Sequence, residues 1–366
     1  MRLRSWEAID LFTEVVTFLK AARAVFERSD DFSRFNSVLG TITAYLGWHQ
    51  IHVCQYAQAR ENLEEAIKLL ENDQSRLERA QAQTILAWLY YEQGKMHRAA
   101  ELQKQGLASF REEGNPWWYR LGIINLARVY VLSGNLSEGE LLCQEGFRLV
   151  APGDLHSVFL LKRANAYLYY FKSDYAKAEQ LMQENLQLGF QYKNHRIVIA
   201  TFLTDLCQVA LATNRIEAAE KYAQECIDLI GEDGESYNLA FAMMYSGKCF
   251  VVRSEGEAGR DQFRQVIRMG QGFDAFHLVY WAMVNIARSY LMEGQTEKAL
   301  EMALLLKDCP VEYKLAQDDS NCLLAELQVV VPKEWAAAMV EQVNGKIAAD
   351  QAQAATLAYA LEHETG

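Results

Sequence analysis

The ten residues NLARVYVLSG (125–134) recur as NIARSYLMEG (285–294), with five of the ten positions identical. The two copies begin 160 residues apart and share Asn, Ala, Arg, Tyr and Gly at matching positions. Self-similarity at a fixed spacing is typical of a protein that stacks copies of one supersecondary unit.

A shorter period connects the two copies. Small residues recur every 39 to 41 residues at Ala59, Ala99, Gly139, Ala178, Ala219, Gly259 and Ala299. A second series of small residues stands twelve positions before the first, at Gly47, Ala87, Ala127, Ala166, Cys207, Gly247 and Ala287. Three positions after the second series an aromatic residue usually follows, namely Tyr90, Tyr130, Tyr169, Phe250 and Tyr290. The chain therefore contains seven repeats of about 40 residues.

Each repeat reads as a helical hairpin. Apolar residues follow at spacings of three and four on both sides of one turn residue, which is Cys54, Gly94, Gly134, Ser173, Asn214, Ser254 or Gly294. Gly and Asn tolerate the left-handed conformation that ends a helix, and small residues let two helix axes approach closely. A single hairpin cannot bury its apolar face, so we expect an all-α solenoid with a continuous core.

The pattern small–aromatic–Gly–small, as in Ala127, Tyr130, Gly134 and Gly139, resembles the tetratricopeptide repeat (TPR) family over roughly residues 33–307. The usual TPR period is 34 residues. The longer unit is similar to the repeats in the sensor arms of bacterial STAND ATPases and maltose-activator-like regulators, and in Gram-positive quorum-sensing regulators. The resemblance implies a right-handed superhelical solenoid of about seven to eight hairpins with capping helices.

The two ends of the chain depart from the repeat. We expect residues 1–32 to form an N-terminal capping helix, residues 33–307 the seven repeats, and residues 308–366 a degenerate eighth repeat with a C-terminal cap. Pro332 stands at or just before a helix start in this last part, and a final helix is expected at roughly 349–363.

The arginine of the opening motif belongs to a stripe of large and polar residues. We number each repeat so that its later small residue, for example Gly139, is position 20. Position 9, which is Arg128 in that repeat, is never a small residue. Position 5 is an arginine in one repeat, at Arg163. The stripe residues that we predict to bind a ligand or partner are Trp48, Trp88, Arg128, Arg163, Tyr167, Gln208, Lys248 and Arg288. In TPR proteins the first helix of each hairpin lines the concave groove, so the resemblance implies that this stripe faces it.

Charge is distributed unevenly between the two helices of a hairpin. The chain carries 36 basic and 48 acidic residues, a net charge of −12, which argues against general affinity for nucleic acid or anionic membranes. The first helices are nevertheless richer in basic than in acidic residues, so their surface favours an anionic ligand. The alternative is that stripe residues are merely solvated or pair with the few acids nearby.

The sequence contains no arrangement typical of an enzyme. The phosphate-binding loop, the G-x-S-x-G elbow and the H-E-x-x-H zinc motif are all missing. His49 and His52 are spaced to reach one metal, but no third ligand is evident, so we predict neither a metal nor a cofactor. Trp117 and Trp118, in the expected linker NPWWYR (115–120), either plug a gap between hairpins or rim a ligand pocket.

These features predict a non-catalytic interaction or sensing module that binds a peptide, a protein segment or an anionic ligand and regulates an attached or partner effector, such as an NTPase. An acidic partner is one alternative that the basic stripe suggests. A peptide-binding quorum-sensing regulator and a structural assembly scaffold are the other interpretations. The seven scattered cysteines, the lack of an apolar leader and the lack of a long apolar segment predict a protein of the cytoplasm with no membrane partner. The resemblance to bacterial regulators implies a bacterial protein.

Overall fold

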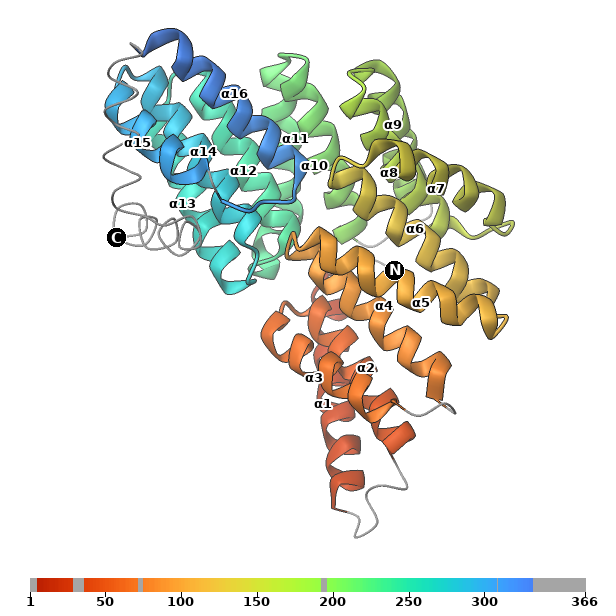
Figure 1. The fold of residues 1–366 in the computed structure, drawn as a ribbon. Helices are drawn as coiled ribbons and strands as arrows, with labels where there is room; N and C mark the ends of the chain where they lie inside the picture. Colours follow the sequence, from red (N-terminus) through yellow and green to blue (C-terminus); the bar gives the residue numbers. More distant parts are fainter. Residues whose placement is uncertain (1–4, 29–35, 72–74, 192–195, 308, 332–366) are drawn as a thin grey trace. The chain divides into compact units, whose positions relative to one another are not determined.

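The computed structural model describes residues 5–28, 36–71, 75–191, 196–307 and 309–331. Every regular element within these ranges is a helix. The chain divides into two compact units, residues 1–185 and 186–366, and each is described by itself (Figure 1).

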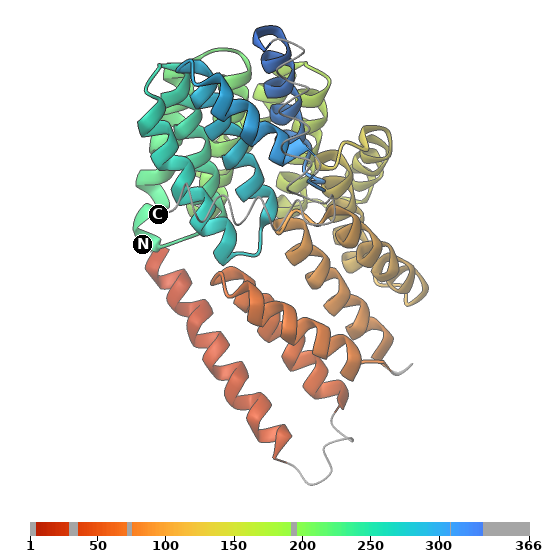
Figure 2. The same ribbon diagram turned by 60° about the vertical axis from the view of Figure 1, so that its left-hand side comes forward.

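Unit 1 begins with one long helix and continues with four hairpins. The long helix, α1 (Ser5–Glu27), is drawn in red in Figure 2 and contacts α2. Its Arg23 pairs with Glu65 on α3 at 2.9 Å. The hairpins are α2 (Asn36–His52) with α3 (Tyr56–Leu69), α4 (Arg76–Glu92) with α5 (Met96–Glu112), α6 (Pro116–Leu132) with α7 (Leu136–Leu149), and α8 (Leu155–Phe171) with α9 (Tyr175–Gln191), which ends in unit 2.

Unit 2 contains three further hairpins and one additional helix. They are α10 (Arg196–Ala212) with α11 (Ile216–Ile230), α12 (Tyr237–Val252) with α13 (Gly256–Gly272), α14 (Phe276–Met292) with α15 (Thr296–Lys307), and α16 (Lys314–Val330). A short 3-10 turn, Gly231–Asp233, follows α11. The prediction of an all-α repeat protein is confirmed.

The seven predicted turn residues all adopt the left-handed conformation, with φ between 55° and 85°. In each hairpin the next residue donates its backbone N–H to the carbonyl five positions back, at 2.8 to 2.9 Å. This hydrogen bond closes the first helix as in a Schellman motif. The positive φ of the turn glycines, which is strained for a residue with a side chain, also occurs at Cys54, Ser173 and Ser254. The place of the residue in the repeat, and not its own conformational preference, therefore determines the turn.

The small residues lie where the two helices of a hairpin meet. All of the alanines and the cysteine in the two series are 0–2% exposed. A Cβ atom on Gly247 would come within 2.6 Å of the buried ring of Phe263. The helices are therefore closer together at these positions than a larger side chain allows.

The first helices of consecutive hairpins form one layer, and the second helices form another. Within unit 1, α2 contacts α4, α4 contacts α6 and α6 contacts α8; within unit 2, α10 contacts α12 and α12 contacts α14. The corresponding pairs of second helices, α3 with α5, α11 with α13 and α13 with α15, have little or no contact with each other. The first helices therefore form the inner layer of each unit, as expected from the TPR resemblance.

The eighth repeat is described only through its first helix. Figure 1 shows α16, in blue, alongside α14, with which it packs. Pro332 and the helix expected at 349–363 lie outside the described residues. The division of the chain into cap, repeats and cap remains a prediction.

The expectation that NPWWYR is a linker was wrong, because α6 begins at Pro116. The Asn115 side chain accepts the backbone N–H of Trp118 and caps the helix. Trp118 stacks on Phe110 of the preceding hairpin at 5.7 Å, while Trp117 is 49% exposed. Among the helices that the structure describes, none combines the length and the apolarity needed to cross a lipid bilayer.

Candidate functional site

The eight stripe residues are divided between the two units. Unit 1 holds Trp48, Trp88, Arg128, Arg163 and Tyr167, and unit 2 holds Gln208, Lys248 and Arg288. All eight lie on first helices, and Tyr167 and Gln208 are buried whereas the others are half-buried. Since each unit is described by itself, the stripe is treated as two inner surfaces.

The stripe of unit 1 begins with a row of stacked rings. Trp48 lies 5.9 Å from the ring of His52 on the same helix, and His52 lies 5.1 Å from Trp88 on α4. His49 also contacts Trp48, at 5.4 Å. His52 therefore helps to join α2 and α4 through ring contacts.

Two arginines continue this inner surface on α6 and α8. The guanidinium of Arg128 lies 4.6 Å above the ring of Tyr91 on α4, and that of Arg163 lies 5.6 Å from Tyr167 on its own helix. A guanidinium that rests on an aromatic face keeps its in-plane N–H donors available to a planar anion. Stacking therefore orients both groups before any ligand arrives.

Glu92, at the end of α4, is the carboxyl group that faces these arginines. Burial raises its pKa to about 7, although the hydroxyl of Tyr56, which donates at 3.0 Å, and the charges of Arg128 and Arg163 act in the opposite direction. At neutral pH Glu92 is therefore only partly ionised. The pair of guanidinium groups keeps a net positive charge.

Arg128 differs from Arg288 in that no carboxylate among the described residues forms an ion pair with it. Its only side-chain hydrogen bond among the described residues is to the amide oxygen of Asn125, at 3.4 Å. Its Nε atom is buried and, within the same part of the chain, makes no hydrogen bond. No described carboxylate forms an ion pair with it.

In unit 2 the basic stripe residues are already neutralised. The Asp319 side chain, on α16, accepts from Lys248 Nζ at 2.7 Å, from Trp281 Nε1 at 2.5 Å and from Asn285 Nδ2 at 3.3 Å. Arg288 donates to the Asp319 backbone oxygen at 3.1 Å and to Glu326 at 3.3 Å. Burial would raise the pKa of Asp319, but Lys248 and Arg288 hold it below its ordinary value.

An aromatic cluster anchors the start of α16 to the same inner layer. The ring of Tyr313, just before α16, lies 5.0 Å from His277, 5.9 Å from Trp281 and 6.2 Å from Phe241. These rings come from α12 and α14, so the inner surface of unit 2 is covered at this point by the chain itself. The structure therefore shows Lys248 and Arg288 in ion pairs within the chain. Their contact with a partner remains a prediction.

The two acids that organise these surfaces, Asp319 and Glu92, were not predicted as site residues from the sequence. Asp319 lies in the weak eighth repeat, where the register that identified the stripe had faded. Glu92 lies one turn after Trp88 on α4, at a position that carries no acid in most repeats. The one feature of the sequence that placed Glu92 near the stripe was its spacing of four residues, about one helical turn, from Trp88.

Metal chemistry has no support in the described residues, where no group of three His, Cys, Asp or Glu side chains could hold an ion. Burial raises the pKa of the Cys143 and Cys226 thiols to about 12, so neither is an activated nucleophile. What the two inner surfaces offer is stacked rings and guanidinium donors, which suit binding.

Comparison with known proteins places these features in a family. Residues 40–231 match the family model of the MalT-like TPR region, which is just over half of the 366 residues. No curated protein matches the chain.

Three solved structures have a similar fold. A Rap protein complexed with Competence and Sporulation Factor gives a TM-score of 0.58 at 11% identity, over 87% of this chain and 87% of that chain. NprR in complex with its cognate peptide NprX gives 0.55 at 13% identity, over 87% and 98%. A STAND protein with a tetratricopeptide repeat sensor from Pyrococcus horikoshii gives 0.49 at 14% identity and covers 96% of this chain, which spans only 55% of that protein. At these identities the likeness concerns the fold alone.

Proposed function

The chain belongs to the family of MalT-like TPR regions, and on that premise we propose that it is a non-catalytic binding module. Its ligand is a peptide or a segment of a partner protein, and the inner surface of unit 1 receives it. The residues that carry the contact are Trp48, Trp88, Arg128, Arg163 and Tyr167. Binding there regulates an effector that is either attached to this chain or a separate subunit, such as an NTPase.

The observation that supports this assignment most is the contrast between the two inner surfaces. In unit 2 the chain supplies its own acid and its own ring, Asp319 and Tyr313, to the inner layer. In unit 1 the half-buried Trp88 and Arg128 face Glu92 of α4, whose pKa burial raises to about 7, and among the described residues this carboxyl forms no ion pair with Arg128. Large aromatic and arginine side chains at a partly exposed surface are the residue types that dominate binding energy at interfaces.

The likeness to NprR, solved with its cognate peptide NprX, favours a segment of polypeptide over a small molecule as the ligand. A quorum-sensing type of regulator, which takes a short free peptide, is the second candidate. An assembly scaffold, which would bind partners through its second helices, is the third. These three differ in which surface is covered and in the size of the ligand.

The experiment compares capture of partners by the wild-type chain, Trp88→Ala and Lys104→Gln from an extract of the source cells. Lys104 lies on the second helix α5, 5.4 Å from the ring of Tyr130, and serves as the control for the outer layer. We expect Trp88→Ala, with an unchanged circular dichroism spectrum, to lose the partner that the other two proteins retain. Loss with Lys104→Gln and retention with Trp88→Ala would instead favour the scaffold.

A further inference from the structure

Arg128 and Arg288 occupy the same position of the repeat, four repeats apart, yet they differ in their surroundings. Each is preceded by an asparagine three residues earlier, Asn125 or Asn285, in the two copies of the opening motif. Arg288 and Asn285 both contact Asp319, which the next first helix supplies. This Asn-x-x-Arg pair therefore binds a carboxylate-bearing residue in unit 2.

The helix that follows Arg128 supplies no such group. The helices α8 and α16 each contain 17 residues, and each packs against the first helix before it. Counted from the helix start, Asp319 is the sixth residue of α16, and the sixth residue of α8 is Leu160. At the thirteenth place, where α16 has Glu326, α8 has Tyr167. Both acids that satisfy Arg288 are thus replaced by uncharged residues beside Arg128.

Nothing else in the described part of unit 1 takes their place. Arg128 keeps one long hydrogen bond to Asn125 and the ring of Tyr91, and its buried Nε donates to no described acceptor. Glu92 faces both Arg128 and Arg163 without an ion pair to Arg128 among these residues, and it is a single carboxyl group against two guanidinium groups. A half-buried cation with an unused donor costs free energy unless an anion completes it.

We propose that Asn125 and Arg128 form the carboxylate anchor of the binding surface in unit 1, and that the ligand is an acidic peptide segment. An Asp or Glu side chain of that segment takes the place that Asp319 occupies in unit 2. The residue that corresponds to Lys248 is Trp88, four repeats earlier. In unit 2 Lys248 shares Asp319 with Arg288, whereas Trp88 offers an apolar face, so an apolar side chain of the ligand, adjacent to its acid, packs on Trp88.

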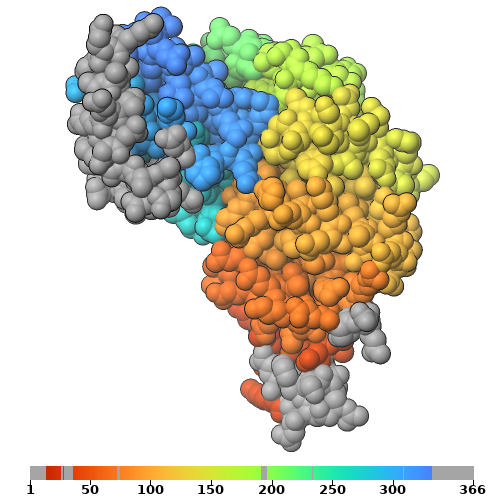
Figure 3. Space-filling model, in the orientation of Figure 1, coloured from red at the N-terminus to blue at the C-terminus, as the bar shows by residue number. Residues whose placement is uncertain are grey.

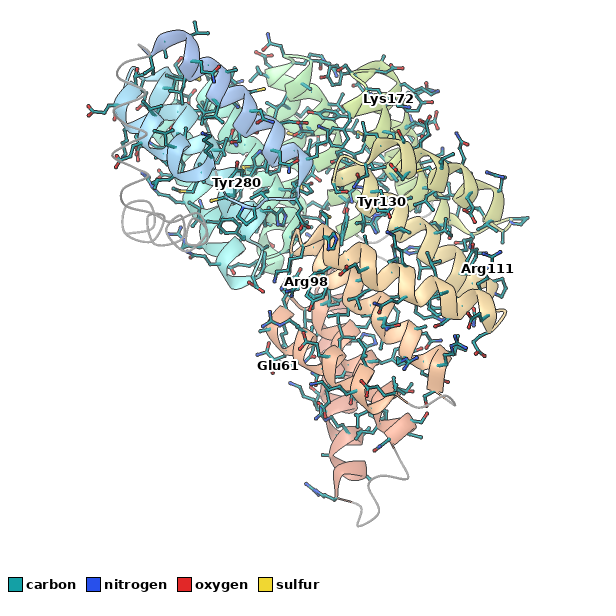
Figure 4. The ribbon with its side chains drawn as sticks, in the orientation of Figure 1. Glu61, Arg98, Arg111, Tyr130, Lys172 and Tyr280 are labelled. Atoms are coloured by element: carbon teal, nitrogen blue, oxygen red, sulfur yellow. The ribbon has the colours of Figure 1, made fainter. Side chains whose placement is uncertain are left out.

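This inference rests on the proposed function, since it names the chemistry of the ligand at the same surface. Its test is a selection from a phage-displayed library of random peptides on the full chain, followed by affinity measurement with synthetic peptides of the enriched sequences. The variants are Arg128→Gln, Asn125→Ala and Trp88→Ala. The control is Arg98→Gln, an exposed arginine on the second helix α5 whose position Figure 4 labels.

The expected result is a set of peptides that carry Asp or Glu next to an apolar residue. Replacing that acid by its amide, or Arg128 by Gln, weakens binding by about tenfold or more, because a charge-assisted hydrogen-bonded pair is lost. The two changes together cost no more than either alone, while Asn125→Ala gives a smaller loss and Arg98→Gln changes affinity by less than about twofold.

Two other results overturn the inference and are distinguishable from each other. Peptides without acids that bind Arg128→Gln as well as the wild type, yet weaken with Trp88→Ala, would refute the carboxylate anchor and leave the proposed surface standing. Peptides that bind the wild type and every stripe variant equally would refute the anchor and count against the proposed function as well. A selection that enriches no peptide on the wild type relative to the Trp88→Ala protein would have the same meaning.

Discussion

Replacing Asp319 by Asn is the most informative perturbation of unit 2. The substitution keeps the shape and an amide oxygen, but it removes the charge that Lys248, Trp281, Asn285 and Arg288 surround. The Lys248 and Arg288 side chains are 14% and 16% exposed, so each is left largely desolvated beside the other.

The magnitude follows from that geometry. Removing one partner of a fully buried ion pair costs about 3–5 kcal/mol, and the residual exposure of these side chains lowers our expectation to about 2–3 kcal/mol of unfolding free energy. For a unit of this size each kcal/mol corresponds to a shift of about 2–4 °C, so we expect the melting temperature of unit 2 to fall by about 5–10 °C. Amide exchange in α16 should accelerate by about 30- to 100-fold.

The control is the same substitution at the preceding residue. Among the described residues Asp318 pairs only with Lys314 on its own helix, at 2.9 Å, and its side chain is 45% exposed, so Asp318→Asn should cost less than about 0.5 kcal/mol. Differential scanning calorimetry and hydrogen exchange measured on both variants decide the matter. Equal stability of the two variants would refute the view that α16 is anchored to the inner layer by its acid.

Three other changes test separate parts of the account. Folding raises the pKa of the Glu92 carboxyl group from 4.5 to about 7, so the folded state binds a proton there more tightly than the unfolded state does. The free energy of unfolding should therefore fall as pH rises from 4.5 to 7. At about 1.4 kcal/mol per pH unit, Glu92→Gln should add about 2–3 kcal/mol at pH 8 and nothing near pH 4; chemical denaturation at both values checks this, and equal effects would contradict it. Ser254→Gly should stabilise the chain by about 0.5–1 kcal/mol, because φ is 64° there; a lower melting temperature would count against the strained turn. Gly247→Ala should destabilise by about 1–3 kcal/mol through contact with Phe263, whereas Gly272→Ala, with nothing within 4 Å, should be neutral; thermal melts of the two proteins should separate clearly.

The periodic features of the fold were predictable from the sequence because one physical constraint repeats in every hairpin. Positions where helix axes meet must be small, and the second residue after a first helix must accept a positive φ. Register alone identified Ser173 and Ser254 as turn residues, although serine has no preference for that conformation.

Whether a basic stripe residue is paired with an acid was less predictable, because this depends on which groups the neighbouring helices bring to each position. The basic end of the stripe was visible in Lys248 and Arg288, but their partner Asp319 stands on a helix whose repeat pattern is weak. The stripe pattern is the same whether such an acid is present, as in α16, or replaced by Leu160, as in α8. Contacts between helices distinguish the two cases. Figure 3 shows that α16, in blue, lies at the surface of unit 2 in that view.

One measurement tests the central claim most directly, namely that the inner surface of unit 1 receives the partner. Hydroxyl-radical footprinting of the chain, free and bound to the captured partner, reports on side-chain coverage on both layers. We expect protection of the half-buried Trp48 and Trp88 on the first helices, and unchanged labelling of the exposed Leu141 and Phe147 on the second helix α7. Protection of Leu141 and Phe147 with unchanged labelling of the two tryptophans would contradict the account.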